Sequence, residues 1–149
     1  MDMEPKYEKR INPPKLINDH FQNYKTYGIP KAQLIIADIP YNIGKDAYGS
    51  NPAWYVDGDG RMVFNCMDWK KDTTTPKIHP TQKPIPVLQN LIRIFTDEGD
   101  VVIDPCAGSG STLLAAYKMN RNAIGFEIKK NFFKDANEKI LSNIQKQLL

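Results

Sequence analysis

The residues of this sequence that could do chemistry gather in two short segments, 104–112 ("DPCAGSGST") and 38–42 ("DIPYN"). Each segment follows a continuous apolar run, which is typical of a buried strand of a parallel sheet. Ligands of open parallel sheets bind at the carboxyl ends of the strands, where loops lead into helices. The two segments are therefore candidate parts of a ligand site.

The first segment joins a carboxylate to a glycine turn that leads into a helix-like stretch. Glycine lets the backbone turn sharply and approach a ligand closely. The helix start offers free N–H groups, worth about 0.3–1 kcal/mol towards an anion. A phosphate-binding P-loop is excluded because no lysine follows Gly110. A dinucleotide fingerprint fits poorly because Leu113 stands where the third glycine is needed.

S-adenosylmethionine is the third ligand class that this arrangement could hold. Its carboxylate suits a turn rich in N–H groups, and its ribose needs an acceptor at the end of the next strand. Glu127 closes the apolar run "AIGFEI". A carboxylate there can accept both ribose hydroxyls, and each such charged hydrogen bond is worth about 1.5–3 kcal/mol.

The second segment places an acid, a proline and an aromatic ring at a strand end. Asp38 can accept a hydrogen bond from an amine, and the carbonyl of Ile39 can accept a second. Tyr41 offers a flat face to a base, and stacking of this kind is worth about 1–3 kcal/mol per base. Considered alone, the segment is better explained as a strand-end turn with a half-buried tyrosine.

Strands and helices alternate around these segments. Apolar runs that suit strands lie at 15–19, 32–38, 101–105 and 123–128. Helices are expected at 20–28, ending at Gly28, at 87–95, at 111–119 and from Asn131 onward. The alternation predicts an α/β fold with a parallel sheet and right-handed crossovers.

Two stretches carry little periodicity. Residues 1–13 are expected to form a loose N-terminal tail, and residues 43–78 an irregular region in which 61–66 could be a strand. The chain of 149 residues is long enough for one domain, 1–149, with one core.

Composition limits the class of protein. No run is apolar enough to span a bilayer, and the charged N-terminus lacks the core of a signal peptide, so we expect a cytoplasmic protein without membrane contact. Cys66 and Cys106 form no CxxC pair, so we expect free thiols and no metal site. The net charge of +3 permits contact with a polyanion without requiring it.

In combination, the motifs resemble those of the DNA amino-methyltransferases. The DPPY motif of that family is similar to "DIPYN", and its DPFxGSGT cofactor loop is similar to "DPCAGSGST". The segment that precedes this loop resembles "HPTQKP" at 79–84, and a short acidic motif upstream of DPPY resembles "LINDHFQNY". The DPPY-like motif comes before the glycine loop, which is the circularly permuted order of the β group. The resemblance covers about residues 14–42 and 77–140.

The resemblance implies a Rossmann-like, S-adenosylmethionine-dependent methyltransferase fold, circularly permuted and with strands missing. It implies transfer of a methyl group to N6 of an adenine flipped out of duplex DNA, and a role in restriction–modification. Asp38, Pro40 and Tyr41 would form the catalytic site. The implied cofactor-binding residues are Asp19, His79, Thr81, Lys83, Asp104, Ala107, Gly108, Ser109, Gly110, Thr112 and Glu127.

Within this set, the resemblance implies distinct roles. Asp19 would lie near the adenine of the cofactor, and Glu127 would bind the ribose. Asp104 and the loop at 107–112 would hold the methionine part. His79, Thr81 and Lys83 would close over the methionine end, with Lys83 facing the carboxylate.

The sequence departs from the family pattern at two motif positions and in the length of the stretch between the motifs at 38–42 and 79–84. Ile39 replaces the first proline of DPPY, and Cys106 replaces the phenylalanine of DPF. Residues 43–78 stand where the family carries further strands and a target-recognition segment. The expected strand order is 14–18, 122–127, 100–104, 33–38, which leaves the last strand with an uncovered edge. We expect either that 61–66 pair with this edge or that a second copy of the chain or a partner subunit covers it.

Two functions therefore stay open. One is an adenine-directed DNA methyltransferase, and the other is a shortened remnant that binds the cofactor without turnover. A dinucleotide-dependent oxidoreductase is a distant third, weakened by Leu113.

Overall fold

A four-stranded parallel sheet forms the centre of the computed structural model, which describes residues 11–37, 54–56, 62–64, 71–142 and 144. The strand order is β1-β6-β5-β2. These strands are β1 (Lys15–Ile17), β2 (Leu34–Ile35), β5 (Val101–Asp104) and β6 (Asn122–Phe126). Both the parallel α/β class and the expected strand order are confirmed.

The register brings the carboxyl ends of three strands to one edge. Ile17 pairs with Phe126, and Asp104 pairs with Gly125. Glu127 follows β6 directly, so its side chain starts at the same edge as that of Asp104. This is the edge where open parallel sheets bind ligands.

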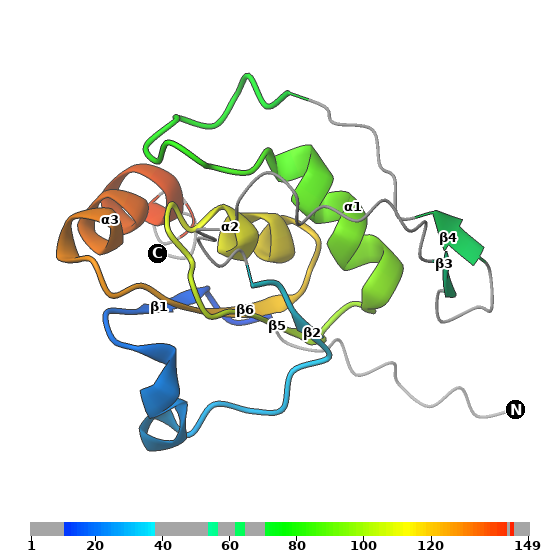
Figure 1. The fold of residues 1–149 in the computed structure, drawn as a ribbon, viewed down its shortest axis with the longest axis horizontal. Helices are drawn as coiled ribbons and strands as arrows, with labels where there is room; N and C mark the ends of the chain where they lie inside the picture. The colour runs from blue at the N-terminus through cyan, green and yellow to red at the C-terminus, as the bar shows by residue number, and fades with distance from the viewer. Residues whose placement is uncertain (1–10, 38–53, 57–61, 65–70, 143, 145–149) are drawn as a thin grey trace, which may run out of the picture.

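Helices lie on both sides of the sheet (Figure 1). Helices α1 (Ile85–Phe95) and α2 (Ser111–Lys118) cover one face, and the 3-10 helix η1 (Phe21–Tyr27) lies on the other. The C-terminal helix is α-helical in α3 (Lys130–Asp135) and continues as the π-helix η2 (Ala136–Leu141). Helix η1 ends at Gly28, as expected, because that residue adopts the left-handed conformation with φ of 57°.

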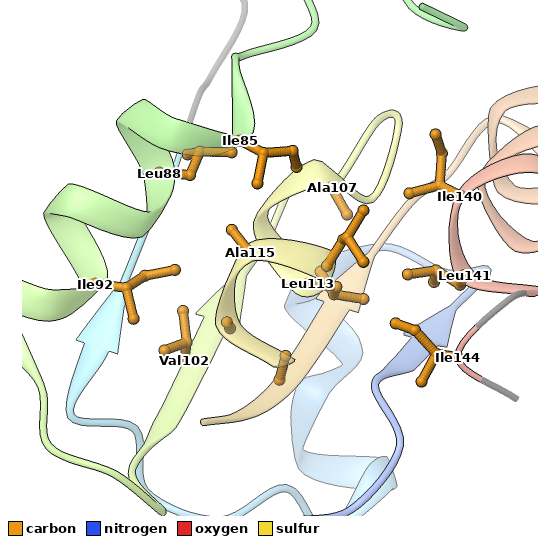
Figure 2. Close-up of a cluster of buried hydrophobic side chains, with 13 residues drawn as sticks. Ile85, Leu88, Ile92, Val102, Ala107, Leu113, Ala115, Ile140, Leu141 and Ile144 are labelled. Carbon is orange, nitrogen blue, oxygen red and sulfur yellow. The ribbon is translucent and has the colours of Figure 1, made fainter. Parts of the chain in front are cut away.

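The core lies between the sheet, α1, α2 and the C-terminal helix (Figure 2). Ile92 of α1, Val102 of β5 and Leu113 of α2 are almost fully buried there. Ile140 and Leu141 close the core from the side of η2. Burial of these side chains, at about 1.5–3 kcal/mol each, holds α2 and its preceding loop against the sheet.

The opposite face of the sheet is only partly covered. Phe126 is fully buried there beneath the rings of Phe21 and Tyr27, whose centroids lie 5.3 and 5.8 Å from its own. Ile35, on the terminal strand β2, is 57% exposed. The apolar cover therefore lies over β6, while β2 presents an apolar side chain to solvent.

Part of the region 43–78 is a hairpin. Strands β3 (Trp54–Val56) and β4 (Met62–Phe64) pair antiparallel, with Trp54 opposite Phe64. The strand at 54–56 was missed because it lies in a stretch rich in glycine and aspartate. Of the two alternatives for covering the edge at 33–38, pairing with 61–66 is wrong, because β4 pairs with β3 in a separate sheet. Closing a short loop costs less entropy than reaching a distant strand. Cover by a second copy of the chain or by a partner subunit stays a prediction.

The N-terminal segment contacts the sheet at Asn12, whose backbone N–H and side-chain amide both donate to Oδ1 of Asn122, at 3.0 and 3.3 Å. Among the described residues, no helix is long and apolar enough to cross a membrane. The same part of the chain contains no group of three or more His, Cys, Asp and Glu side chains that could hold a metal ion.

Candidate functional site

The loop between β5 and α2 turns tightly at the carboxyl edge of the sheet. Asp104 is 4% exposed, and its Oδ1 accepts a hydrogen bond from the N–H of Cys106 at 3.0 Å. The N–H of Ala107 donates to the carbonyl of Phe126 at 2.8 Å, which ties the loop to β6. Gly108 and Gly110 have φ of 53° and 76°, a region that side chains rarely enter, so both glycines are required by the turn.

Glu127 joins this loop to the next strand. Its Oε2 accepts the N–H of Gly108 at 2.9 Å, and its Oε1 accepts the N–H of Lys129 at 2.8 Å. The residue is 8% exposed, so these two bonds offset part of the cost of burying its charge. A carboxylate oxygen can accept two hydrogen bonds, and the described residues supply one to each oxygen, which leaves a second acceptor position on each.

The backbone at Glu127 is held as firmly as its side chain. Its N–H donates to the carbonyl of Ile17 at 2.9 Å, and its carbonyl accepts Nδ2 of Asn18 at 2.7 Å. Strand β1 thus fixes the position from which the carboxylate reaches Gly108. The sequence predicted the location of Glu127 but not its hydrogen bond to the glycine loop.

Residues 72–85 form a braced segment that leads into α1. Oδ1 of Asp72 accepts the N–H groups of Thr74 and Thr75 at 2.9 and 3.1 Å, and its Oδ2 accepts the N–H of Ile85 at 3.4 Å. Burial raises the pKa of the Asp72 carboxyl, but the hydrogen bonds from Thr75 and Thr74 outweigh it and hold that pKa well below its ordinary value. Asp72 therefore anchors one end of the segment at the start of α1.

The side chain of Gln82 braces the middle of the same segment. Its Oε1 accepts the N–H of Ile78 at 2.9 Å, and its Nε2 donates to the carbonyl of Pro76 at 2.9 Å. Lys83 is half-buried and directly precedes Pro84, the N-cap residue of α1. The motif at 79–84 is thus a preformed turn.

His79 brings this turn onto the glycine loop. Its ring lies 3.6 Å, at Cδ2, from the position that a Cβ on Gly108 would take. The ring of Phe132, from α3, lies against it with centroids 4.3 Å apart. Thr81 contacts Nδ1 of the same ring through its N–H at 3.3 Å and its hydroxyl at 3.1 Å. The structure therefore brings His79, Thr81, Gly108 and Glu127 together.

The remaining glycine-loop residues are packed inside the protein. Ala107, Ser109, Gly110 and Thr112 are buried, and the hydroxyls of Ser109 and Ser111 lie 2.7 Å apart. Their side chains stabilise the loop from within. The face of the loop that is available to a ligand is therefore largely backbone.

Asp19 organises the turn after β1. Its Oδ2 accepts the hydroxyl of Tyr27 at 2.6 Å, and its Oδ1 accepts the N–H of His20 and Nδ2 of Asn23 at 2.7 and 3.0 Å. These bonds, that from Tyr27 first, lower the pKa of the Asp19 carboxyl, and the same contact raises the pKa of the Tyr27 hydroxyl. The expected catalytic residues Asp38, Pro40 and Tyr41 lie outside the described residues.

Two residues of this site escaped sequence reasoning. In the sequence, Phe132 is an ordinary apolar residue of the C-terminal helix. Its ring contact with His79 in the structure makes it part of the site. Gly125 has no unusual φ, but a Cβ there would lie 2.7 Å from Cδ1 of Leu113 and 2.9 Å from Cβ of Ala107. A glycine inside a strand is the signal that could have indicated this close approach.

Comparison with known proteins places the chain in a family. Residues 57–138, more than half of the chain, match the model of the N6_N4_Mtase family, described as DNA methylase. Type II methyltransferase M.HindIII of Haemophilus influenzae is 42% identical over 89 residues, which are 60% of this chain and 29% of that protein. Type II methyltransferase M.HpaI of Haemophilus parainfluenzae is 39% identical over 64 residues, which are 43% of this chain and 20% of that protein.

Two solved structures are also similar. The M1.HpyAVI–SAM complex is 40% identical, with a TM-score of 0.42, over 44% of this chain and 32% of that one. PvuII DNA methyltransferase, described as cytosine-N4-specific, is 33% identical, with a TM-score of 0.42, over 45% of this chain and 24% of that one. The chain thus spans less than a third of the length of these relatives. Because the family model matches more than half of the chain, including the motifs at 79–84 and 104–112, this protein belongs to the N6/N4 DNA methylase family.

Proposed function

We propose that this chain binds S-adenosylmethionine between its glycine loop and Glu127, and that it acts as a DNA methyltransferase in restriction–modification. The observation that carries the proposal is the pair of hydrogen bonds that the N–H groups of Gly108 and Lys129 donate to the carboxylate of Glu127. They leave one acceptor position on each carboxylate oxygen, which suits the two hydroxyls of a ribose. The M1.HpyAVI–SAM complex, a solved structure similar to part of this chain, carries the same cofactor by its title.

The catalytic step rests on the motif at 38–42. Asp38 and the carbonyl of Ile39 accept hydrogen bonds from the two hydrogens of an exocyclic amine. These bonds favour a pyramidal nitrogen, whose lone pair is no longer delocalised into the ring and can attack a methyl group. Tyr41 stacks on the base and offsets part of the few kcal/mol that extrusion from the duplex costs. When bound, S-adenosylmethionine supplies an electrophilic methyl group on a sulfonium. The chain contributes mainly by orientation, and the amine proton leaves through the acceptor at Asp38.

Adenine N6 is the proposed target. The support is the aspartate of "DIPYN", since cytosine-N4 enzymes of this family more often carry serine at that position. The similarity to a cytosine-N4-specific enzyme, PvuII DNA methyltransferase, makes cytosine N4 the competing target. Mass spectrometry of nucleosides from methylated duplex DNA separates the two products. N4-methylcytosine without N6-methyladenine would contradict the proposed target.

A second candidate function is cofactor binding without turnover. It is favoured by the short interval at 43–78, where the family carries further strands and a target-recognition segment, and by Ile39 in place of a rigid proline. Transfer of a labelled methyl group to mixed-sequence duplex DNA, with Asp38→Ala as the inactive reference, decides between the two. Transfer that depends on Asp38 supports the enzyme, and cofactor binding without transfer supports the remnant.

Cofactor binding itself is tested by calorimetry with S-adenosylmethionine. We expect Glu127→Gln to weaken binding at least several-fold, because the amide replaces an acceptor oxygen with a donor that faces other N–H groups. Glu138→Gln makes the same exchange at an exposed position of η2 and should leave binding unchanged. Absence of binding to the unmutated protein would overturn the proposal.

A further inference from the structure

A pocket of about 280 Å³ lies outside the proposed cofactor site. Its walls come from the segment that contains Thr74 and Pro76, from the C-terminal part of α2 and from the C-terminal helix. The glycine loop precedes the first residue of α2, and neither Gly108 nor Glu127 lines the pocket. Its volume is close to the lower end of the range for small-molecule sites, about 300–1,000 Å³.

The buried part of the pocket lining is apolar. Leu114 of α2 lines it together with Ile140 and Ile144 of the C-terminal helix, and all three are buried. Figure 2 shows Ile140 and Ile144 on the side of their helix that faces α2. Ile140 belongs to the π-helix η2, and π-helical turns are rare and occur frequently at functional sites. This part of the lining suits the apolar body of a ligand, which it removes from water.

Two exposed lysines also line the pocket. Lys118 is the last residue of α2, and its side chain makes no ion pair with a described residue. Lys139 of η2 contacts Oδ1 of Asp135 at 2.8 Å, but its side chain is 51% exposed, so its ammonium keeps donors for a second partner. Among the described residues, no aspartate or glutamate lines the pocket. The charge of the lining therefore suits an anion.

The end of α2 beside Lys118 would ordinarily oppose an anion, because a helix carries partial negative charge at its C-terminus. Here the last carbonyls already accept hydrogen bonds. The carbonyl of Ala116 accepts the N–H groups of Met119 and Arg121, and the guanidinium of Arg121 donates to the carbonyl of Met119. These donors and the charge of Arg121 weaken the negative potential at this end. The ammonium of Lys118 therefore remains available to a ligand.

Hydroxyl groups complete the lining. Tyr117 lines the pocket, and its hydroxyl makes no hydrogen bond to a described residue, so it can donate to a ligand. Thr74 and Thr75 also line the pocket, and both donate hydrogen bonds to Asp72. The carboxylate of Asp72 also accepts the N–H of Ile85, so its charge is compensated within its own segment. An anion in the pocket thus meets donors and little opposing charge.

We propose that this pocket is a second binding site, which takes a small organic anion with an aromatic body, such as an aromatic carboxylate. The apolar rings lie against Leu114, Ile140 and Ile144, and the anionic group meets Lys118 and Lys139. The inference goes beyond the proposed function and does not depend on it, because no residue of the glycine loop takes part.

Nuclear magnetic resonance titrations of the backbone amides with three probes test the proposal. 2-Naphthoate carries the apolar rings and the charge, 2-naphthamide carries the rings alone, and acetate carries the charge alone. We expect 2-naphthoate to shift the amides of residues 74–75, 114–118 and 139–141. It should bind about threefold or more tightly than 2-naphthamide, since ion pairs at an exposed rim contribute modestly. Acetate should give no saturable shift there, because it offers no body for the apolar lining to bury.

Variants at the two lysines locate the charge that the anion meets. Lys118→Gln combined with Lys139→Gln should weaken binding of 2-naphthoate by about threefold or more and leave binding of 2-naphthamide unchanged. The matched control combines Lys130→Gln with Lys134→Gln, which removes the same charge from exposed positions of α3 and should change neither affinity.

Four outcomes would overturn the inference. The first is absence of 2-naphthoate binding, and the second is binding whose shifts centre on the glycine loop at 107–110. The third is equal affinity for 2-naphthoate and 2-naphthamide, which would show that the pocket does not recognise the charge. The fourth is equal weakening by the two double variants, which would show that only the net charge of the protein matters.

Discussion

Gly125 of β6 and Leu113 of α2 approach each other so closely that a Cβ on Gly125 would lie 2.7 Å from Cδ1 of Leu113. Cβ of Ala107 would be only 2.9 Å away on the loop side. Leu113 is 1% exposed and Gly125 is buried, so neither side can yield into solvent. This contact determines how near the glycine loop lies to β6, and thus to Glu127.

Gly125→Ala should therefore destabilise the protein by about 1–3 kcal/mol, the usual cost of overpacking a core. The free energy of unfolding from urea denaturation measures this. The matched test is the double variant Gly125→Ala with Leu113→Ala. The alanine at position 113 lacks the Cδ1 atom that a Cβ on residue 125 would meet. The double variant should be more stable than the sum of the two single effects predicts. Simple additivity would show that the two residues do not compete for space.

Asp72 should make stability depend on acid pH. Hydrogen bonds from Thr75 and Thr74 hold its folded-state pKa below the unfolded value of 3.8, despite the opposing effect of burial. Its contribution is thus fully present above the unfolded pKa and is lost as the pH falls from there through the lowered folded-state pKa. Melting temperatures of Asp72→Asn and the unmutated protein should differ most near neutral pH and converge in acid. A constant difference down to about pH 2 would contradict this sign.

Asp72→Asn should also loosen the segment that carries His79, because Asp72 holds both Thr75 and the N–H of Ile85. Glu138→Gln on the exposed side of η2 is the control for loss of one carboxylate. Hydrogen exchange of the Thr74, Thr75 and Ile85 amides should increase in Asp72→Asn and not in the control. Unchanged exchange would show that the turn is held by other contacts, such as those of Gln82.

Arg121 should be among the most sensitive residues of the protein. It is 6% exposed, and its guanidinium donates to the hydroxyl and carbonyl of Thr96 at 3.0 and 2.6 Å and to the carbonyl of Met119. Arg121→Lys keeps the charge but cannot reach all three acceptors, so we expect a loss of about 2–4 kcal/mol in the free energy of unfolding. Arg93→Lys, at an exposed site on α1, is the control and should change stability by less than about 0.5 kcal/mol. Equal effects of the two substitutions would contradict the prediction.

The edge at β2, which has no further strand beside it among the described residues, should lead to self-association. Ile35 is 57% exposed on the terminal strand of the sheet, and apolar side chains on terminal strands attract further strands. Sedimentation velocity over a range of concentrations should show association of the unmutated protein. Ile35→Lys should reduce it, because a charge opposes pairing at an edge. A protein that stays monomeric at all concentrations would show that the edge has no partner among copies of itself.

The sequence alone predicted the four strands of the central sheet and their order. Apolar runs ending at Asp104 and Glu127 mark buried strands because burial on both faces of a parallel sheet demands continuous apolar residues. The turn at 107–110 was predictable because glycine is required where φ is positive, as it is at Gly108 and Gly110. The order of the strands followed from the family motifs, which are themselves local patterns.

Only the tertiary structure decided which of these segments touch. The bond from Gly108 to Glu127, the contact of His79 with Phe132 and the three bonds of Arg121 join residues that are distant in sequence. The pairing of 54–56 with 62–64 also ruled out one of the two covers expected for the edge at β2. Local sequence patterns indicate which residues are buried and where the chain turns. Side-chain contacts between distant residues depend instead on how closely the helices, strands and loops approach one another. Here that approach is governed by a single missing side chain at Gly125.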